Sequence, residues 1–259
     1  MAAEIAPRPS DDIAGLRNDL EAEQRCLVDD LRGVEADDWF TVTAAEGWDV
    51  RDTVAHLADT DEIAIDTCTD GPRSLTRLAT ALASAEDVTL WGVLEGRRQP
   101  GPEVLAWWED AQDRERSVLA SLDPAMRVPW GLGMRVPSFL TARLMETWAH
   151  GLDVRTALGL ASPDTARLRH VAWLAIRALP YAYQVASREP PASLPRVELR
   201  GPDDVTWTYG PADAPARITG DAGEFCRLFV RRLSRGDAHT LRAEGADADA
   251  ALDVARAYL

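Results

Sequence analysis

The chain has 259 residues, of which 46% are hydrophobic and 27% are charged, so it is long enough to bury a core and has the composition of a globular protein. Its net charge of −15 argues against nucleic acid or an anionic membrane surface as the main partner. All 28 Lys and Arg positions are arginines, which excludes Schiff-base chemistry on a lysine.

The sequence shows no sign of a membrane span, a secretion signal or a disulfide framework. No apolar run reaches the length of about 18 residues that a span needs, and no charged segment followed by an apolar one opens the chain. Cys26, Cys68 and Cys226 are widely spaced and odd in number, unlike a set of disulfides or a paired-cysteine metal site. We therefore expect a soluble, cytoplasmic protein that is a monomer or a homodimer.

The first half of the chain is predicted to be helical. Apolar residues at helical spacing run through 13–31. A second helix is expected after Asp49, which can cap it together with Asp52 in an arrangement like a capping box. A weaker helical pattern covers 74–95 and ends at a stretch rich in proline and glycine.

Three further helical segments follow. Pro102 is expected to open a helix that runs to Leu119. After a linker rich in glycine and proline, Ser138 is the predicted cap of a helix that Gly159 closes. Another helix is expected over about 164–186.

After about residue 190 the pattern changes to short strands and helices. Alternating polar and apolar residues predict strands, and two amphipathic segments predict helices. The expected strands are 196–201, 204–210, 216–220 and 239–245, and the expected helices are 223–236 and 247–259. The sequence therefore predicts a mainly α fold in two domains, a helical domain over 1–188 and a small α+β domain over 192–259.

Two of the predicted helices carry side chains that suit a metal. Glu146 and His150 are four residues apart, so they lie on one face of their helix about 5–6 Å from each other and can share one divalent ion. His56 on the second helix can complete the site if the two helices pack together, as in metal sites of helical bundles. Two imidazoles and a carboxylate suit zinc, iron or nickel and leave coordination positions open. Taken alone, however, the spacing also fits an ordinary surface pair and a hydrogen-bonded histidine.

Two motifs add a family resemblance. GWDVRDTVAHLADT and ARLMETWAHGLDVRTALG, in this order, resemble the DinB-like helical-bundle metalloproteins, specifically the mycothiol-dependent maleylpyruvate isomerase superfamily. The segment from ARITG to the C-terminus resembles the small domain of a metal-binding branch of that superfamily. The resemblance implies a four-helix bundle followed by a small α+β domain. It also implies that His56, Glu146 and His150 hold one divalent metal, commonly zinc.

The resemblance also implies an enzyme that uses a low-molecular-weight thiol such as mycothiol on a small electrophilic substrate. A metal with an open position can hold the thiol as the reactive thiolate. In an isomerase the thiolate adds to an activated double bond and leaves after rotation, whereas in an S-transferase it stays attached. Two alternatives remain open at this point: a thiol-independent hydrolase, cyclase or lyase, and a non-catalytic metal- or ligand-binding protein.

Five other residues are candidates for supporting roles, each with an ordinary alternative. Asp153 and Asp59, three residues after the two histidines, are catalytic candidates that can orient an imidazole or simply face solvent. Arg143 can hold a substrate carboxylate at the site or form an ion pair. Arg231 and Arg232 lie in an arginine-rich predicted helix and can bind an anionic substrate or belong to a solvated face.

Overall fold

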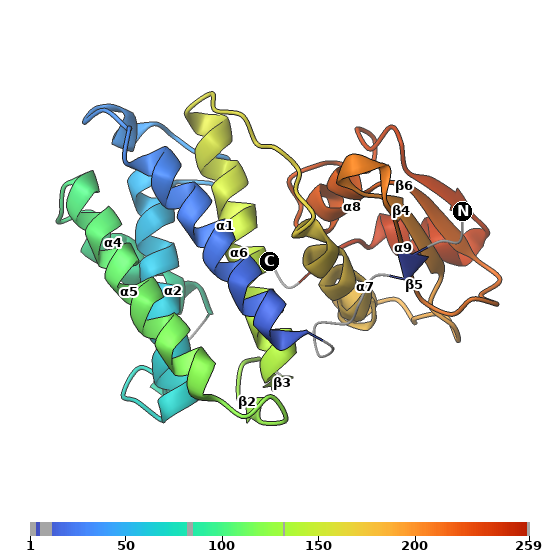
Figure 1. The fold of residues 1–259 in the computed structure, drawn as a ribbon, viewed down its shortest axis with the longest axis horizontal. Helices are drawn as coiled ribbons and strands as arrows, with labels where there is room; N and C mark the ends of the chain where they lie inside the picture. The colour runs from blue at the N-terminus through green and yellow to red at the C-terminus, as the bar shows by residue number, and fades with distance from the viewer. Residues whose placement is uncertain (1–3, 6–11, 82–84, 132, 258–259) are drawn as a thin grey trace. The chain divides into compact units, whose positions relative to one another are not determined.

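The computed structural model describes residues 4–5, 12–81, 85–131 and 133–257 (Figure 1). Contacts between residues divide the chain into two compact units. One unit is Asp12–Ser162, here called the helical unit. The other contains Pro163–Leu259 together with the N-terminal strand β1 (Glu4–Ile5), and is here called the sheet unit. None of the described helices combines the length and the apolar composition that crossing a membrane requires.

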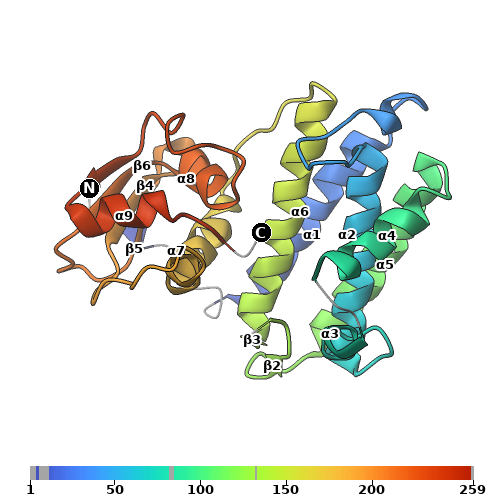
Figure 2. The same cartoon turned by 180° about the vertical axis from the view of Figure 1, so that it is seen from behind.

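Four long helices form the body of the helical unit (Figures 1 and 2). Helices α1 and α2 each pack against both α5 and α6. The bounds of the four are α1 Ile13–Leu31, α2 Val50–Thr69, α5 Gly101–Ser121 and α6 Val136–Ala157. Shorter elements connect them: the 3-10 turn η1 (Asp38–Phe40), α3 (Leu75–Ala81), α4 (Ala85–Gly96), β2 (Arg127–Val128) and β3 (Met134–Arg135).

The helical core is built from the apolar faces of these helices. Leu27 of α1, Val54 of α2, Trp108 of α5 and Val154 of α6 belong to one buried cluster. Such burial contributes about 1.5–3 kcal/mol for each large apolar side chain, so this cluster stabilises the unit. The predicted helix cap at its edge is confirmed, because the Asp49 carboxylate accepts a hydrogen bond from Asp52 N at 2.8 Å and the Asp52 carboxylate accepts one from Asp49 N at 3.3 Å.

Several polar and charged residues are buried along helix α6. Arg143, His150, Asp153 and Arg155 all lie among its buried residues. A charged side chain is costly to remove from water unless it finds a partner, so each of these residues calls for an ion pair, a hydrogen bond or a metal.

The sheet unit contains one five-stranded mixed sheet and three helices. Strand order is β1-β5-β4-β6-β7, with β4 antiparallel to β5 and parallel to β6. The elements not yet given are α7 Leu168–Val185, β4 Arg196–Arg200, η2 Pro202–Asp204, β5 Thr206–Tyr209, β6 Arg217–Asp221, α8 Ala222–Phe229, β7 Arg242–Glu244 and α9 Ala246–Asp253. Val197 and Leu199 are buried at alternate positions of β4, as the period-two pattern predicts, and Trp207 of β5 and Ile218 of β6 are buried as well.

The structure corrects the predicted domain boundary. Helix α7 was expected to belong to the helical domain over 1–188, but it lies in the sheet unit, which begins at Pro163. Its apolar face packs against α8 and β5, and Tyr209 donates a hydrogen bond to the carbonyl oxygen of Arg169 at 2.9 Å. The helical periodicity of the segment is right, but periodicity alone does not say which core a helix covers.

Two local details differ from what the sequence predicts. Helix α6 begins at Val136 rather than after Ser138, because Pro137 occupies its first turn, where a missing N–H costs nothing. The helical pattern over 74–95 is confirmed over its described residues, which form α3 and α4. Strand β1 was not predicted, since a two-residue strand shows too little alternation to be recognised.

Candidate metal centre

The side chains of His56, Glu146 and His150 converge at one point in the helical unit. Each offers one ligand atom, and the three atoms lie within 4.8 Å of one another. Helices α2 and α6, which carry them, pack side by side (Figure 2). The two imidazole rings meet edge to face, with their centroids 4.8 Å apart. Among the described residues, no fourth His, Cys, Asp or Glu joins this group.

His150 is oriented by a neighbour on its own helix. Its Nδ1 atom lies 3.2 Å from Oδ2 of Asp153, and both side chains are buried. A carboxylate beside Nδ1 favours the tautomer in which Nδ1 carries the hydrogen and Nε2 presents a lone pair. The structure therefore places Asp153 against His150 rather than in solvent, and leaves Nε2 facing Glu146.

Glu146 lies next to that lone pair. Its Oε2 atom is 3.6 Å from His150 Nε2, and its side chain is 20% exposed. Burial alone would raise the pKa of Glu146, but the positive charge of His150 in its protonated form, with the charges of Arg143 and His56, outweighs burial and lowers the pKa. The group therefore stands as a carboxylate at neutral pH, the form in which it can bind a cation.

His56 enters the site from the N-terminal half of α2. Its Nδ1 atom lies 3.5 Å from Thr60 Oγ1, so Nε2 is the nitrogen left to face the other helix. Thr60 itself donates to the carbonyl oxygen of His56 at 2.6 Å, a bond within one helical turn. The indole of Trp48, in the loop before α2, packs against both imidazoles, with centroids 4.9 Å from His56 and 6.2 Å from His150.

The donor set and its dimensions fit a divalent metal. Zinc binds nitrogen and oxygen at about 2.0–2.2 Å, so two ligands on a tetrahedral ion lie about 3.4 Å apart. The distance of 3.6 Å between His150 Nε2 and Glu146 Oε2 is close to this value. His56 needs only a small side-chain rotation, since all three ligand atoms already lie within 4.8 Å. Three protein ligands leave at least one position open, as in catalytic rather than structural zinc sites.

Asp59 lies outside this group. Its carboxylate forms an ion pair with Arg73, which follows α2, and a side chain added at Gly92 of α4 would collide with it. Burial raises the pKa of Asp59 to about 6, although the Arg73 guanidinium opposes this shift. The structure therefore joins Asp59 to the contact between α2 and α4, and gives it a partner other than His56.

Arg143 is held in a buried ion-pair network. Its guanidinium pairs with Asp61 of α2 and, at 2.9 Å, with Glu115 of α5. Trp108 Nε1 also donates to Asp61, at 3.0 Å, and Gln24 of α1 donates to Glu115 at 3.3 Å. This network joins all four long helices. Of the two roles that the sequence left open for Arg143, the structure shows the ion pair.

Arg231 and Arg232 do not lie on a helix, contrary to the prediction. Helix α8 ends at Phe229, and Arg231 adopts the left-handed conformation with φ of 62°. The reason is a closing turn in which Arg232 N donates to the carbonyl oxygen of Arg227 at 2.8 Å. Both arginines belong to the sheet unit, so their part in substrate binding stays a prediction.

Sequence reasoning missed three residues at the centre of the helical unit: Trp48, Asp61 and Glu115. Trp48 stands in the GWDV motif, but nothing in its spacing shows that its ring would reach both imidazoles. Asp61 and Glu115 are 54 residues apart and meet only because α2 and α5 pack together around Arg143. A buried arginine on a ligand-bearing helix is the one signal that could have prompted a search for them.

Comparisons with known proteins agree with the resemblance. Residues 20–155 match the model of the mycothiol maleylpyruvate isomerase N-terminal domain. Uncharacterized proteins from two strains of Mycobacterium tuberculosis are each 38% identical over 243 residues, which cover 93% of this chain and 93% of each relative.

Solved structures show the same fold. The crystal structures of the mycothiol-dependent maleylpyruvate isomerase and of a mutant with alanine in place of a histidine match with TM-scores of 0.61 and 0.60. Each match covers 89% of this chain and 92% of the solved chain at 13% sequence identity. Identity at this level supports a shared fold alone. From its sequence match and its relatives, the chain belongs to the family of the mycothiol maleylpyruvate isomerase N-terminal domain.

Proposed function

We propose that this chain is a metal-dependent enzyme that uses a low-molecular-weight thiol, as an isomerase or an S-transferase, on a small electrophilic substrate. The observation that carries the proposal is the convergence of His56, Glu146 and His150 in a member of this family. Zinc is the metal we propose, with nickel or iron as alternatives, because all three accept two imidazoles and a carboxylate.

The residues of the site have separable tasks. His56, Glu146 and His150 would hold the ion, and Asp153 fixes the His150 tautomer through its contact with Nδ1. A divalent ion bound there would supply the positive charge that keeps a thiol deprotonated at neutral pH. Arg231 and Arg232 stay proposed contacts for an anionic group of the substrate.

The proposed chemistry balances without an external oxidant or reductant. The thiolate sulfur forms a bond to one carbon of a double bond conjugated to a carbonyl, and the displaced electron pair moves toward that carbonyl. The former double bond can then rotate. In an isomerase the electron pair returns, the carbon–sulfur bond breaks again and the thiol is released, whereas in a transferase the enolate takes up the proton that the thiol lost, so the thioether is the product and the thiol is consumed.

Open coordination positions favour this proposal over a purely binding protein. A structural or storage site fills its shell with protein ligands, whereas the described residues supply only three here. The same open positions would also serve a thiol-independent hydrolase, cyclase or lyase, and the experiment below separates that class from the one proposed.

The purified full-length chain, loaded with zinc, is expected to convert maleylpyruvate, or to add mycothiol to an alkene conjugated to a carbonyl, only when mycothiol is added. Product formation and thiol are measured together: an isomerase returns the thiol, whereas a transferase consumes one thiol for each product. Chelator-treated protein is expected to be inactive and to recover when zinc is restored. Full turnover of either substrate in thiol-free buffer would refute the thiol part of the proposal.

A further inference from the structure

The indole of Trp48 lies against both histidines of the candidate metal centre. Its ring is tilted over His56 at a centroid distance of 4.9 Å and is nearly parallel to His150 at 6.2 Å. An aromatic ring in contact with two imidazoles restricts the rotation of both, in addition to the apolar area it buries. Because Trp48 contacts the ligands and offers no metal-binding atom, its effect on the site must act through them.

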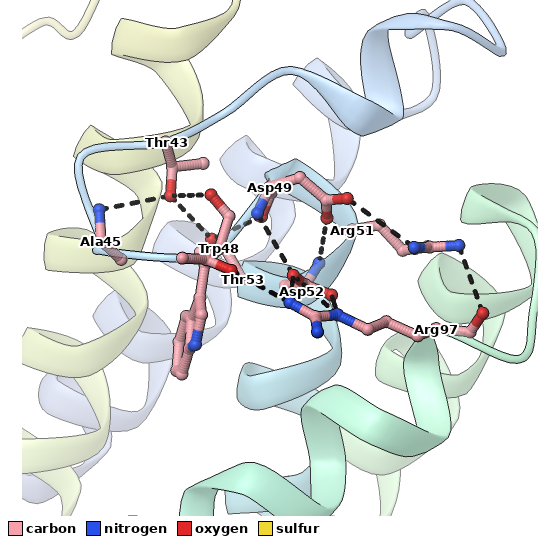
Figure 3. A network of polar contacts seen from close by, with 9 residues as sticks. Thr43, Ala45, Trp48, Asp49, Arg51, Asp52, Thr53 and Arg97 are labelled. Carbon is pink, nitrogen blue, oxygen red and sulfur yellow. Dashed lines mark hydrogen bonds and ion pairs between the residues drawn. The ribbon is translucent and has the colours of Figure 1, made fainter.

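The backbone around Trp48 is fixed from within its own loop. Trp48 N donates to the carbonyl oxygen of Ala45 at 3.0 Å, and the carbonyl oxygen of Trp48 accepts from Thr43 N at 2.9 Å and from Thr43 Oγ1 at 3.1 Å. Figure 3 shows the bond from Thr43 Oγ1, with the indole of Trp48 projecting away from the polar network. With its peptide groups held in this way, the indole retains only its side-chain torsions.

Arg97 ties this loop to the start of α2. Its guanidinium donates to the buried Asp52 carboxylate, with Nε at 3.0 Å from Oδ1 and Nη2 at 2.7 Å from Oδ2. Nη2 also donates to the carbonyl oxygen of Gly47, the residue before Trp48, at 3.0 Å. Asp52 in turn accepts from Asp49 N within the capping box (Figure 3). One arginine therefore holds both ends of the short segment that carries Trp48.

We infer that Trp48 and Arg97 are positioning residues of the metal centre. Arg97 fixes the loop, the loop fixes the Trp48 indole, and the indole holds the imidazoles of His56 and His150 in the orientation that a metal needs. Preorganised ligands bind more tightly because less side-chain freedom is lost on binding. This inference rests on the proposed metal site, and it adds residues that neither bind the ion nor belong to the ligand-bearing helical faces.

The test compares the zinc affinity of the metal-stripped wild type with that of variants, by competition with a chromophoric chelator. Residues that orient metal ligands typically contribute about 10- to 100-fold to metal affinity, so Trp48→Ala is expected to weaken zinc binding by about that factor. Trp48→Phe keeps an aromatic ring in place and is expected to retain most of the affinity. Arg97→Met is expected to weaken binding by about tenfold, although it leaves every ligand and Trp48 intact.

The visible spectrum of the cobalt-loaded protein supplies a second readout, since it reports the arrangement of the ligands rather than stability. We expect the spectrum to change in Trp48→Ala and Arg97→Met and to stay close to wild type in Trp48→Phe. Matched controls are Arg98→Met, whose guanidinium pairs with Glu95 in solvent, and Trp91→Ala, an exposed tryptophan against Arg73. Both controls are expected to match the wild type, and far-ultraviolet circular dichroism verifies the fold of each variant.

The outcomes are distinguishable. Wild-type affinity and spectrum in folded Trp48→Ala, with normal zinc binding by the wild type, would overturn the inference and leave the proposed function standing. Equal losses in the control variants would also overturn it, because the effect would then be general destabilisation. Wild-type zinc affinity and cobalt spectrum in Arg97→Met would show that Arg97 is not a positioning residue of the metal centre. If the wild-type protein itself binds no zinc, the proposed function fails, and the inference fails with it.

Discussion

Replacement of His150 by alanine is expected to abolish stoichiometric zinc binding. His150 supplies one of three ligands and is itself oriented by Asp153, so its loss leaves only His56 and Glu146. Two ligands from two helices form a much weaker site than three, because fewer metal–ligand bonds offset the entropy that is lost when the side chains are ordered. The wild type, dialysed after zinc loading, should retain about one zinc per chain by elemental analysis, and the variant should retain almost none.

The control for this prediction is His239→Ala, since His239 is exposed in the sheet unit and does not belong to the group of three ligands. It is expected to load zinc like the wild type. Unchanged loading of His150→Ala would refute the ligand assignment.

Replacement of Arg143 by methionine is expected to destabilise the protein by about 3–5 kcal/mol, because it leaves the buried carboxylate of Asp61 without its cation and removes the hydrogen bond from the guanidinium to Glu115. Methionine fills part of the volume, so the loss reflects charge rather than a cavity. For a chain of this size the melting temperature should fall by about 10 °C, measured by circular dichroism at neutral pH. A change below about 1 kcal/mol would show that the network contributes little.

Glu115→Gln is the matched variant for this network. Burial and the nearby Asp61 carboxylate raise the pKa of Glu115 from 4.5 to about 8, although Arg143 opposes this shift. The folded protein therefore keeps a proton on Glu115 that the unfolded chain releases, so wild-type stability should fall as pH rises from 4.5 to about 8. The Glu115→Gln variant, whose side chain is always neutral, should be nearly as stable as wild type at neutral pH. Its free energy of unfolding should fall less steeply as pH rises. An equally steep decline in the variant would contradict the assignment.

Most of the helical architecture can be predicted from local sequence signals. The capping box of Asp49 and Asp52 and the proline at the start of α5 are decided within one helical turn, and both predictions are confirmed. The end of α8 could not be predicted in the same way. The arginine pattern suggests that the helix continues, whereas the carbonyl oxygen of Phe229 accepts a hydrogen bond from Ala257 N, far along the chain. Long-range contacts of this kind leave no trace in periodicity.

The candidate site shows the same division. The spacing of Glu146 and His150 fixes their common face, but the approach of His56 depends on the packing of α2 against α6. The helical patterns alone offer His56 as a ligand that depends on this packing, and the family resemblance then implies it as the third ligand. The roles of Trp48 and Arg97 could not be predicted from the sequence. Trp48 acts through ring contacts, and Arg97 acts through a loop that is 50 residues away along the chain at Gly47.

The most direct test of the account is a crystal structure of the zinc-loaded protein with anomalous diffraction measured on both sides of the zinc absorption edge. One strong anomalous peak per chain is expected, at about 2.0–2.2 Å from a nitrogen of His56, a nitrogen of His150 and a carboxylate oxygen of Glu146. A peak elsewhere, or none at these three side chains in protein that binds one zinc, would contradict it.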